Sequence, residues 1–311
     1  MQKNETSNIP DDEIDLTELL SVLWKGKWII ITGVFLFSVL SIAYALHQPN
    51  TYKSEVLLSP AEEPQNGGIG GLAGQFGGLA SLAGVNLGSS TNNKTQLAIE
   101  ILKSRQFIGN FIQKHDILPD LMAAESWNAQ SNEIKYLSSL YEEKNSKWVR
   151  QVSPPFEAKP SLQEAYKEFR KIVKIETDKE SGMITLSAEF ISPYIAQQWV
   201  NWLVEDINQV MKERDVSEAN KSTVFLTNQL KETKIADIRA VLYKLVEEQA
   251  KTIMFANVRD EYVFKTIDPA LVPEIKSGPK RALICILGAL LGGIFSVVFI
   301  TIRYFIRENA R

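Results

Sequence analysis

Two long stretches without charge constrain the fold of this chain more than any other feature. "WIIITGVFLFSVLSIAYAL" at 28–46 and "ALICILGALLGGIFSVVFITI" at 282–302 contain no charged residue. Each is close to the length of about 20 residues that a helix needs to cross the hydrocarbon core of a bilayer. A cleaved signal peptide is disfavoured for the first stretch, because its apolar core is too long and no A-x-A cleavage site follows it. The sequence therefore predicts two transmembrane helices.

These helices divide the chain into parts whose location follows from the topology. The tails, 1–27 and 303–311, lie on one side of the membrane, and the loop 47–281 lies on the other. Lysine and arginine residues border the spans on both sides. Long loops translocate largely regardless of their charge, so the short tails set the orientation. We therefore expect a two-pass protein of the bacterial inner membrane, with both termini cytoplasmic and the bulk of the chain in the periplasm.

Composition and motifs give little support to an enzyme or a nucleic-acid-binding protein. The formal net charge of -3 gives no reason to expect a nucleic-acid partner. His47 and His115, the two histidines, lack metal-ligand spacing with other candidate ligands. The sequence has no G-x-x-x-x-G-K-[ST] motif for nucleotide phosphates, and its only cysteine, Cys285, falls within the second span. We expect no catalytic residue, no cofactor and no metal site.

The loop 47–281 contains segments typical of both strands and helices. "TYKSEVLLSP" at 51–60 predicts a strand, and "KIVKIETDKESGMITLSAEF" at 171–190 predicts a β-hairpin, because its apolar residues alternate. Between them, "QLAIEILKSRQFIGNFIQKH" at 96–115 predicts one amphipathic helix. We interpret residues 120–160 as loop and short helix. Together these segments predict an α/β base domain.

A very long helix is expected after the hairpin. Ser192 and Pro193 are typical of a helix start, and no glycine or further proline occurs from there to about Ala256. A helix over 193–256 would extend roughly 90 Å at 1.5 Å per residue. It forms either a single rod or two parts separated near "DVSEANK" at 215–221, where the apolar pattern changes phase. Apolar residues recur with an approximate heptad spacing typical of a coiled coil, at Ile235, Ile238, Leu242 and Leu245. This stripe predicts packing against a partner helix.

The fold class that follows is an α+β membrane protein. Two transmembrane helices flank a periplasmic α/β base domain that carries a very long extended helix. The chain returns to the membrane through a strut at 267–281, which is stiff and extended because proline excludes helix at Pro269, Pro273 and Pro279.

Small residues recur along one face of the second span. Gly288, Gly292 and Ser296 are four residues apart. Small side chains let helices approach closely within lipid, so this face can pack on another span and couple the protein to a partner. The alternative is that these glycines have no such role, since glycine is common in membrane helices.

A glycine-rich segment at 66–93 follows the first predicted strand. It contains no charge, and its large apolar residues, Phe76 and Leu79 among them, recur at steps of three or four. A flexible linker seldom places apolar side chains so regularly. Either this segment contacts the lipid bilayer or neighbouring subunits, or it is a disordered loop, since glycine makes an isolated helix unfavourable.

Three stretches of the sequence resemble the Wzz-type chain length determinant family, the polysaccharide co-polymerases. They are "DEIDLTELLSVLWKGKW" at 12–28, "SPYIAQQWVNWLVEDIN" at 192–208 and "YKLVEEQAKTIMFANVRDEYVFKTIDPALVPEIKSGPKR" at 243–281. The last is the most specific, and the likeness covers nearly the whole chain. The missing nucleotide motif separates it from members with a fused tyrosine kinase domain.

The resemblance implies a regulator of surface polysaccharide chain length, with lipopolysaccharide O antigen as the first candidate. It implies a non-catalytic, ring-like homo-oligomer that acts with a separate membrane polysaccharide polymerase, and with lipid-linked polysaccharide as a further partner. The strut, Gly288 and Gly292 carry over as residues tied to function. The alternatives are a length or export regulator for another exopolysaccharide, capsule or enterobacterial-type common antigen, a two-span periplasmic sensor, or an enzyme that polymerises sugars itself.

Overall fold

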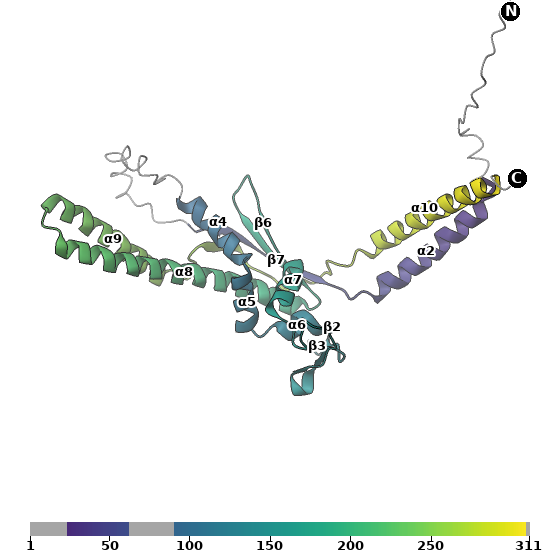
Figure 1. Ribbon diagram of the computed structural model, residues 1–311, viewed down its shortest axis with the longest axis horizontal. Helices are drawn as coiled ribbons and strands as arrows, with labels where there is room; N and C mark the ends of the chain where they lie inside the picture. Colours follow the sequence, from purple (N-terminus) through teal and green to yellow (C-terminus); the bar gives the residue numbers. More distant parts are fainter. Residues whose placement is uncertain (1–23, 62–89, 309–311) are drawn as a thin grey trace, which may run out of the picture. The chain divides into compact units, whose positions relative to one another are not determined.

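The computed structural model describes residues 24–61 and 90–308, and the chain forms two compact units (Figure 1). One unit contains the residues up to Asn50 and from Gly278 onward, and the other is Thr51–Ser277. We call them the membrane unit and the base unit.

The membrane unit is a pair of helices that pack along each other, α2 (Lys27–His47) and α10 (Arg281–Glu308) (Figure 1). Lys27–His47 and Arg281–Ile306 are long and apolar enough to cross a bilayer. The two predicted transmembrane helices are therefore confirmed as helices of suitable length and composition. The second continues beyond the predicted end at residue 302, since no proline or glycine follows to stop it.

A four-stranded antiparallel sheet forms the centre of the base unit. Its order is β6 (Val173–Thr177), β7 (Ile184–Phe190), β1 (Tyr52–Pro60) and β8 (Phe264–Asp268). The predicted first strand and hairpin are confirmed, and Gly182, at φ +70°, provides the left-handed residue of the hairpin turn. Strand β8, which pairs with β1 from about 200 residues away along the chain, was not predicted.

Short helices join this sheet around a shared apolar core. They are α4 (Ser90–Leu102), α5 (Arg105–Lys114), α6 (Leu118–Ala123) and α7 (Leu162–Ile172). The single helix predicted for 96–115 is wrong, because Ser104 is extended and its side chain accepts a hydrogen bond from the Phe107 amide, which starts a second helix. Phe111 of α5 packs against Phe169 of α7, and both are fully buried.

Two small hairpins occupy the region that we expected to be loop and short helix. The first pairs β2 (Ala124–Asn128) with β3 (Glu133–Tyr136), and the second pairs β4 (Tyr141–Glu142) with β5 (Lys147–Trp148) across the short 3-10 helix η1 (Glu143–Asn145). An aromatic pair stabilises the second hairpin, where Tyr141 and Trp148 face each other with ring centroids 5.0 Å apart.

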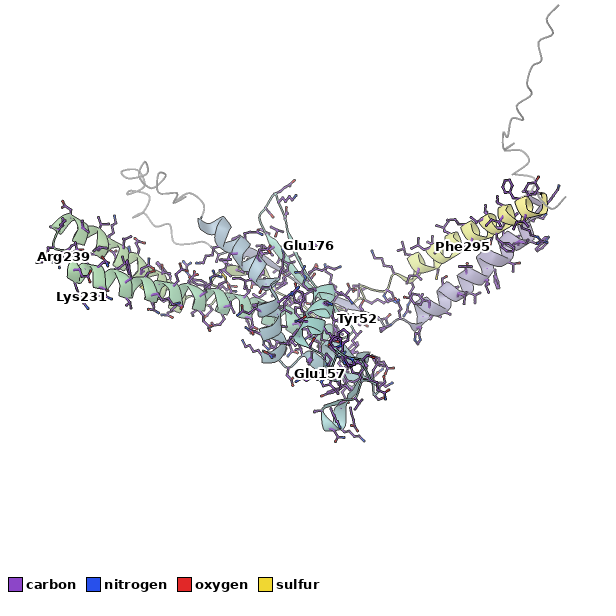
Figure 2. The ribbon with its side chains drawn as sticks, in the orientation of Figure 1. Tyr52, Glu157, Glu176, Lys231, Arg239 and Phe295 are labelled. Carbon is purple, nitrogen blue, oxygen red and sulfur yellow. The ribbon has the colours of Figure 1, made fainter. Side chains whose placement is uncertain are left out.

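The single helix predicted for about 193–256 is also wrong, because the chain reverses after Glu232. Helix α8 (Pro193–Glu232) is followed by α9 (Ala236–Val258), which packs back along α8 (Figure 1). Thr233 and Ile235 are extended, and Lys231 and Arg239 lie at the end of this helical hairpin (Figure 2). A single rod would leave the apolar faces of both halves unpacked, which the reversal avoids. The alternative break at 215–221 is absent as well, since α8 is continuous there.

Candidate functional site

The small residues of the second span lie against the first span of the same chain. A Cβ added at Gly292 would come within 2.8 Å of the Phe37 Cβ and 3.0 Å of the Gly33 carbonyl oxygen. A Cβ added at Gly288 would overlap the side chain of Ser41. Ser296, which is buried, donates a hydrogen bond to the Gly292 carbonyl over 2.7 Å. The three predicted positions therefore form the closest part of the α2–α10 contact.

The strut is attached to β1, to α8 and to Thr51, just before β1, by hydrogen bonds. The Ser54 hydroxyl of β1 donates to the Leu271 carbonyl, and the Gln197 amide of α8 donates to the Ala270 carbonyl, each over 2.8 Å. The Ser277 amide donates to the Thr51 carbonyl, also over 2.8 Å. The strut from Ala270 to Ser277 is thus held on the sheet and on α8.

The prolines of the strut differ in their surroundings. Pro269 is exposed directly after β8, and Pro273 is half-buried between the attached residues. Pro279 falls in the membrane unit, where its carbonyl accepts from the Arg281 amide over 2.9 Å. Two large apolar side chains between these prolines, Leu271 and Ile275, are 68% and 82% exposed.

The predicted stripe on the second half of the helical region is mostly exposed. Ile235 is 60%, Ile238 47% and Leu245 40% exposed, whereas Leu242 is half-buried. Glu248 and Ala256, further along α9, are buried within the hairpin. The stripe therefore lies largely outside the α8–α9 contact. Phe76 and Leu79, the predicted membrane or subunit contacts, fall outside the described residues.

One asparagine, which sequence reasoning did not identify, connects α8 to the start of β8. The Oδ1 of Asn208 accepts from the amides of Tyr262, Val263 and Phe264 over 3.1, 2.8 and 3.0 Å. Its Nδ2 donates to the Phe264 carbonyl over 3.1 Å, and the residue is 5% exposed. This one amide therefore makes four hydrogen bonds, three accepted and one donated, which fix the returning chain on α8.

Two groups of charged residues attach the short helices to α8. The carboxylate of Asp206 lies 2.5 Å from the Lys114 ammonium and 2.9 Å from the His115 Nε2. The His115 ring stacks on Trp202 with ring centroids 4.1 Å apart. Further along α8, Asp215 binds Lys94 of α4 at 2.5 Å and accepts from the Tyr262 hydroxyl at 2.6 Å.

The environment of this second group changes the pKa of the Tyr262 phenol. Burial, and then the hydrogen bond that the hydroxyl donates to Asp215, raise its pKa to about 12. The phenol is therefore neutral at physiological pH and acts as a hydrogen-bond donor.

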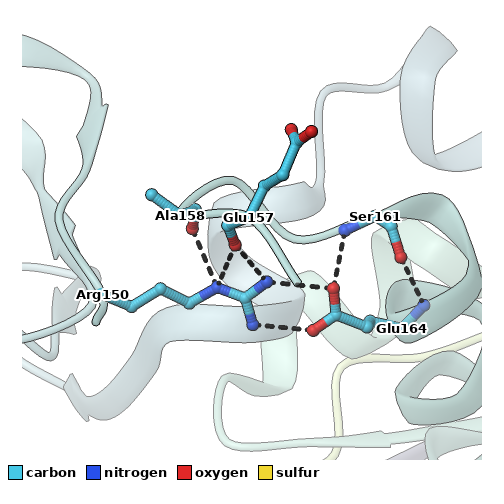
Figure 3. Close-up of polar contacts among 5 residues, drawn as sticks. All are labelled: Arg150, Glu157, Ala158, Ser161 and Glu164. Carbon is cyan, nitrogen blue, oxygen red and sulfur yellow. Dashed lines mark hydrogen bonds and ion pairs between the residues drawn. The ribbon is translucent and has the colours of Figure 1, made fainter. Parts of the chain in front are cut away.

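Arg150 organises the segment that leads into α7 (Figure 3). Its guanidinium forms a bidentate ion pair with Glu164 at 2.7 and 2.9 Å. It also donates hydrogen bonds to the carbonyls of Glu157 and Ala158. Glu164 also accepts from the Ser161 amide, so that Ser161 and Glu164 form a capping box. The Arg150 hydrogen bonds lower the pKa of Glu164 to about 2. The S-x-x-E spacing of Ser161 and Glu164 is a sequence signal for a capping box. Arg150 lies outside this motif, so the sequence does not indicate its pairing with Glu164.

The charged groups of these clusters are paired with residues distant in sequence, and these pairs join separate segments of the base unit. Among the described residues, 24–61 and 90–308, no group of three or more His, Cys, Asp and Glu side chains could hold a metal ion. The features that remain as candidates for function are the membrane helix pair, the attached strut and the exposed stripe.

Comparison with known proteins gives one family and several solved structures. Residues 12–115 match the family model described as Wzz, chain length determinant protein. No curated protein matches the chain. The solved structures include a full-length bacterial polysaccharide co-polymerase, with 15% identity over 94% of this chain and 99% of that one, at a TM-score of 0.38.

Two further solved structures are similar over slightly less of the chain. A fragment of WzzB, a polysaccharide co-polymerase from Salmonella Typhimurium, is 11% identical over 74% of this chain and all of that one, at a TM-score of 0.29. A mutant of WzzBSF, the lipopolysaccharide O-antigen chain-length regulator of Shigella flexneri, is 10% identical over 73% of this chain and all of that one, at a TM-score of 0.21.

Proposed function

We propose that this chain, a Wzz-type chain length determinant by the match of residues 12–115, regulates the length of a surface polysaccharide as a non-catalytic scaffold in the bacterial inner membrane. Lipopolysaccharide O antigen is the polysaccharide we propose, and a separate membrane polymerase performs the polymerisation. The family match is the observation that carries this proposal.

The architecture supports a scaffold that connects membrane and periplasm. Two helices suited to the bilayer lie at the two ends of the described chain. Between them in the sequence lies the base unit of 227 residues, Thr51–Ser277. In our proposal the base unit lies in the periplasm and both tails lie in the cytoplasm. Because the strut is attached to β1 and α8, residues 270–277 belong to the folded base unit and are not a loose tether.

A homo-oligomer is the second part of the proposal. Besides the exposed stripe on α9, α8 has two exposed apolar side chains, Val224 and Phe225, each 63% exposed. Apolar side chains at this spacing on a helical hairpin are typical of a surface that packs on another helix. We propose that a neighbouring copy covers this surface, and that repetition of the contact closes a ring.

Deletion of the gene, followed by complementation, tests the function. We expect the deletion strain to make the same polysaccharide with a changed distribution of chain lengths, visible as an altered ladder on a gel, and the intact gene to restore it. Complete loss of polymer would indicate a polymerising enzyme, and an unchanged ladder with a changed transcriptional response would indicate a sensor. A changed ladder for a polysaccharide other than O antigen would retain the regulator and correct its substrate.

A further inference from the structure

The membrane helix pair contains a groove of about 740 Å³ on one face. Its walls come from both helices and are almost entirely apolar. They include Trp28, Thr32 and Leu36 of α2 and Phe295, Phe299 and Ile302 of α10. The two hydroxyls of the lining are already bonded, because Thr32 donates to the Trp28 carbonyl and Ser296 donates to the Gly292 carbonyl, each over 2.7 Å. The groove therefore suits a hydrocarbon rather than a polar ligand.

The groove spans about half the thickness of a membrane. Its α2 wall runs from Trp28 to Phe37, roughly 14 Å along a helix at 1.5 Å per residue. At its inner end Phe37 and Phe295 stack with ring centroids 5.7 Å apart, and beyond them the close contact of Gly288 with Ser41 joins the helices. A hydrocarbon core is about 30 Å thick, and a partner transmembrane helix would contact the pair along much of it. A tail from one leaflet matches the shorter length.

The open end of the groove carries positive charge. Arg303 lies four residues after Phe299 on α10, so helical spacing places it on the groove-lining face, and Lys25 lies just before the start of α2, three residues before Trp28. Lys27 is nearby, with its ammonium 5.5 Å from the centroid of the Trp24 ring. The one acidic residue within α2 and α10 is Glu308, the last residue of α10. This end favours an anionic headgroup.

We propose that the groove is a binding site for an anionic phospholipid of the leaflet at this end. One acyl chain lies between α2 and α10 as far as the Phe37–Phe295 stack, and the phosphate is bound by Lys25 and Arg303. The site concerns the membrane unit alone, so it holds whichever polysaccharide the protein serves. A lipid bound there would make the packing of the helix pair sensitive to the phospholipid composition of the membrane.

Native mass spectrometry of the detergent-purified full chain tests this site. Phosphatidylglycerol and phosphatidylcholine with the same acyl chains are added in equal amounts, and the lipid retained by the protein is measured. We expect preferential retention of phosphatidylglycerol. The double variant Lys25→Gln/Arg303→Gln should weaken this retention about tenfold or more, since each cation near a membrane surface contributes about 1 kcal/mol.

Matched controls separate this site from general surface charge. Lys276→Gln/Lys280→Gln removes the same charge beside the other end of α10 and should leave the retention unchanged. Thr32→Phe should fill the groove and reduce retention, whereas Ile31→Phe, at an exposed position outside the groove, should not.

Three results would overturn the proposal. They are equal retention of the two lipids, an equal loss in the two charge variants, and capture of protein rather than lipid by a photo-crosslinking residue in place of Thr32. The last result would assign the groove to a helix of another chain.

Discussion

The side chain of Asn208 shows how much one buried amide can determine. It satisfies three successive amides at the point where the chain returns from the helical hairpin to the sheet. We predict that Asn208→Ala lowers the free energy of unfolding of the base unit by about 3 kcal/mol, because buried donors lose their acceptor. Thermal or chemical unfolding of the purified protein measures this change.

Asn201, exposed on the same helix, provides the control. Asn201→Ala should change the free energy of unfolding by about 0.5 kcal/mol or less, as is usual for surface positions. Equal effects of the two variants would show that the Asn208 hydrogen bonds do not stabilise the fold.

Glu164 gives the base unit a defined dependence on pH. Its pKa in the folded protein is about 2, below the usual 4.5, because Arg150 hydrogen-bonds to the ionised form. A carboxyl group whose pKa is lowered in the folded protein stabilises the fold at pH values above its usual pKa. This contribution is lost as the pH falls from about 4.5 towards 2. We predict that the stability difference between the native protein and Glu164→Gln shrinks over this range in unfolding measurements.

The exposed Glu168 on the same helix allows a comparison. It pairs with Lys171 three residues away, and its side chain is 42% exposed. Exposed ion pairs contribute little to stability, so Glu168→Gln should change the free energy of unfolding only slightly. The same profile for both variants would contradict a special role for Arg150.

At the scale of the elements, two adjacent glycines distinguish close helix packing from general glycine content. A Cβ at Gly292 would press on Phe37 and on the backbone of α2, whereas a Cβ at Gly293 would meet only Val34, at an ordinary 3.7 Å. We predict that Gly292→Ala destabilises the α2–α10 pair by roughly 1–3 kcal/mol, the usual range for overpacking. It should also broaden the distribution of polysaccharide lengths in cells.

Gly293→Ala is a closely matched control, with the same chemical change one residue away. It should leave the melting temperature in detergent and the length distribution near those of the native protein. If the two variants behave alike, the contact at Gly292 has no part in function and the glycines of α10 reflect composition only.

The helical hairpin offers a test of assembly. Ile238 and Leu245 are exposed, so Ile238→Gln/Leu245→Gln should change the stability of a single chain by less than about 1 kcal/mol. If a neighbouring copy covers the stripe, the same variant should reduce the particle mass measured by light scattering in detergent. Tyr243→Gln, at a 56% exposed position on another face of α9, should leave the mass unchanged. An unchanged mass in the stripe variant would remove the stripe from the proposed ring.

For the molecule as a whole, prediction succeeded where the signal was local. Hydropathy located α2 and α10, and alternation located β1 and the β6–β7 hairpin, since each pattern lies within one segment. Prediction failed where contacts between segments that are distant in the sequence determine the secondary structure. Strand β8 forms because β1 has a free edge, and the hairpin at 141–148 forms because Tyr141 and Trp148 pair across it.

The sequence by itself determined which segments are apolar enough for a membrane, which alternate as strands, and that no proline or glycine breaks the region from 194 to 256. Only the tertiary structure decided that this region reverses at 233–235, that Asn208 receives the returning chain, and that Gly292 rather than Gly293 leaves no room for a Cβ against the other helix. The physical reason is that propensity and periodicity act within a few residues. The direction of a reversal and the closeness of a contact depend instead on which distant surfaces can bury each other.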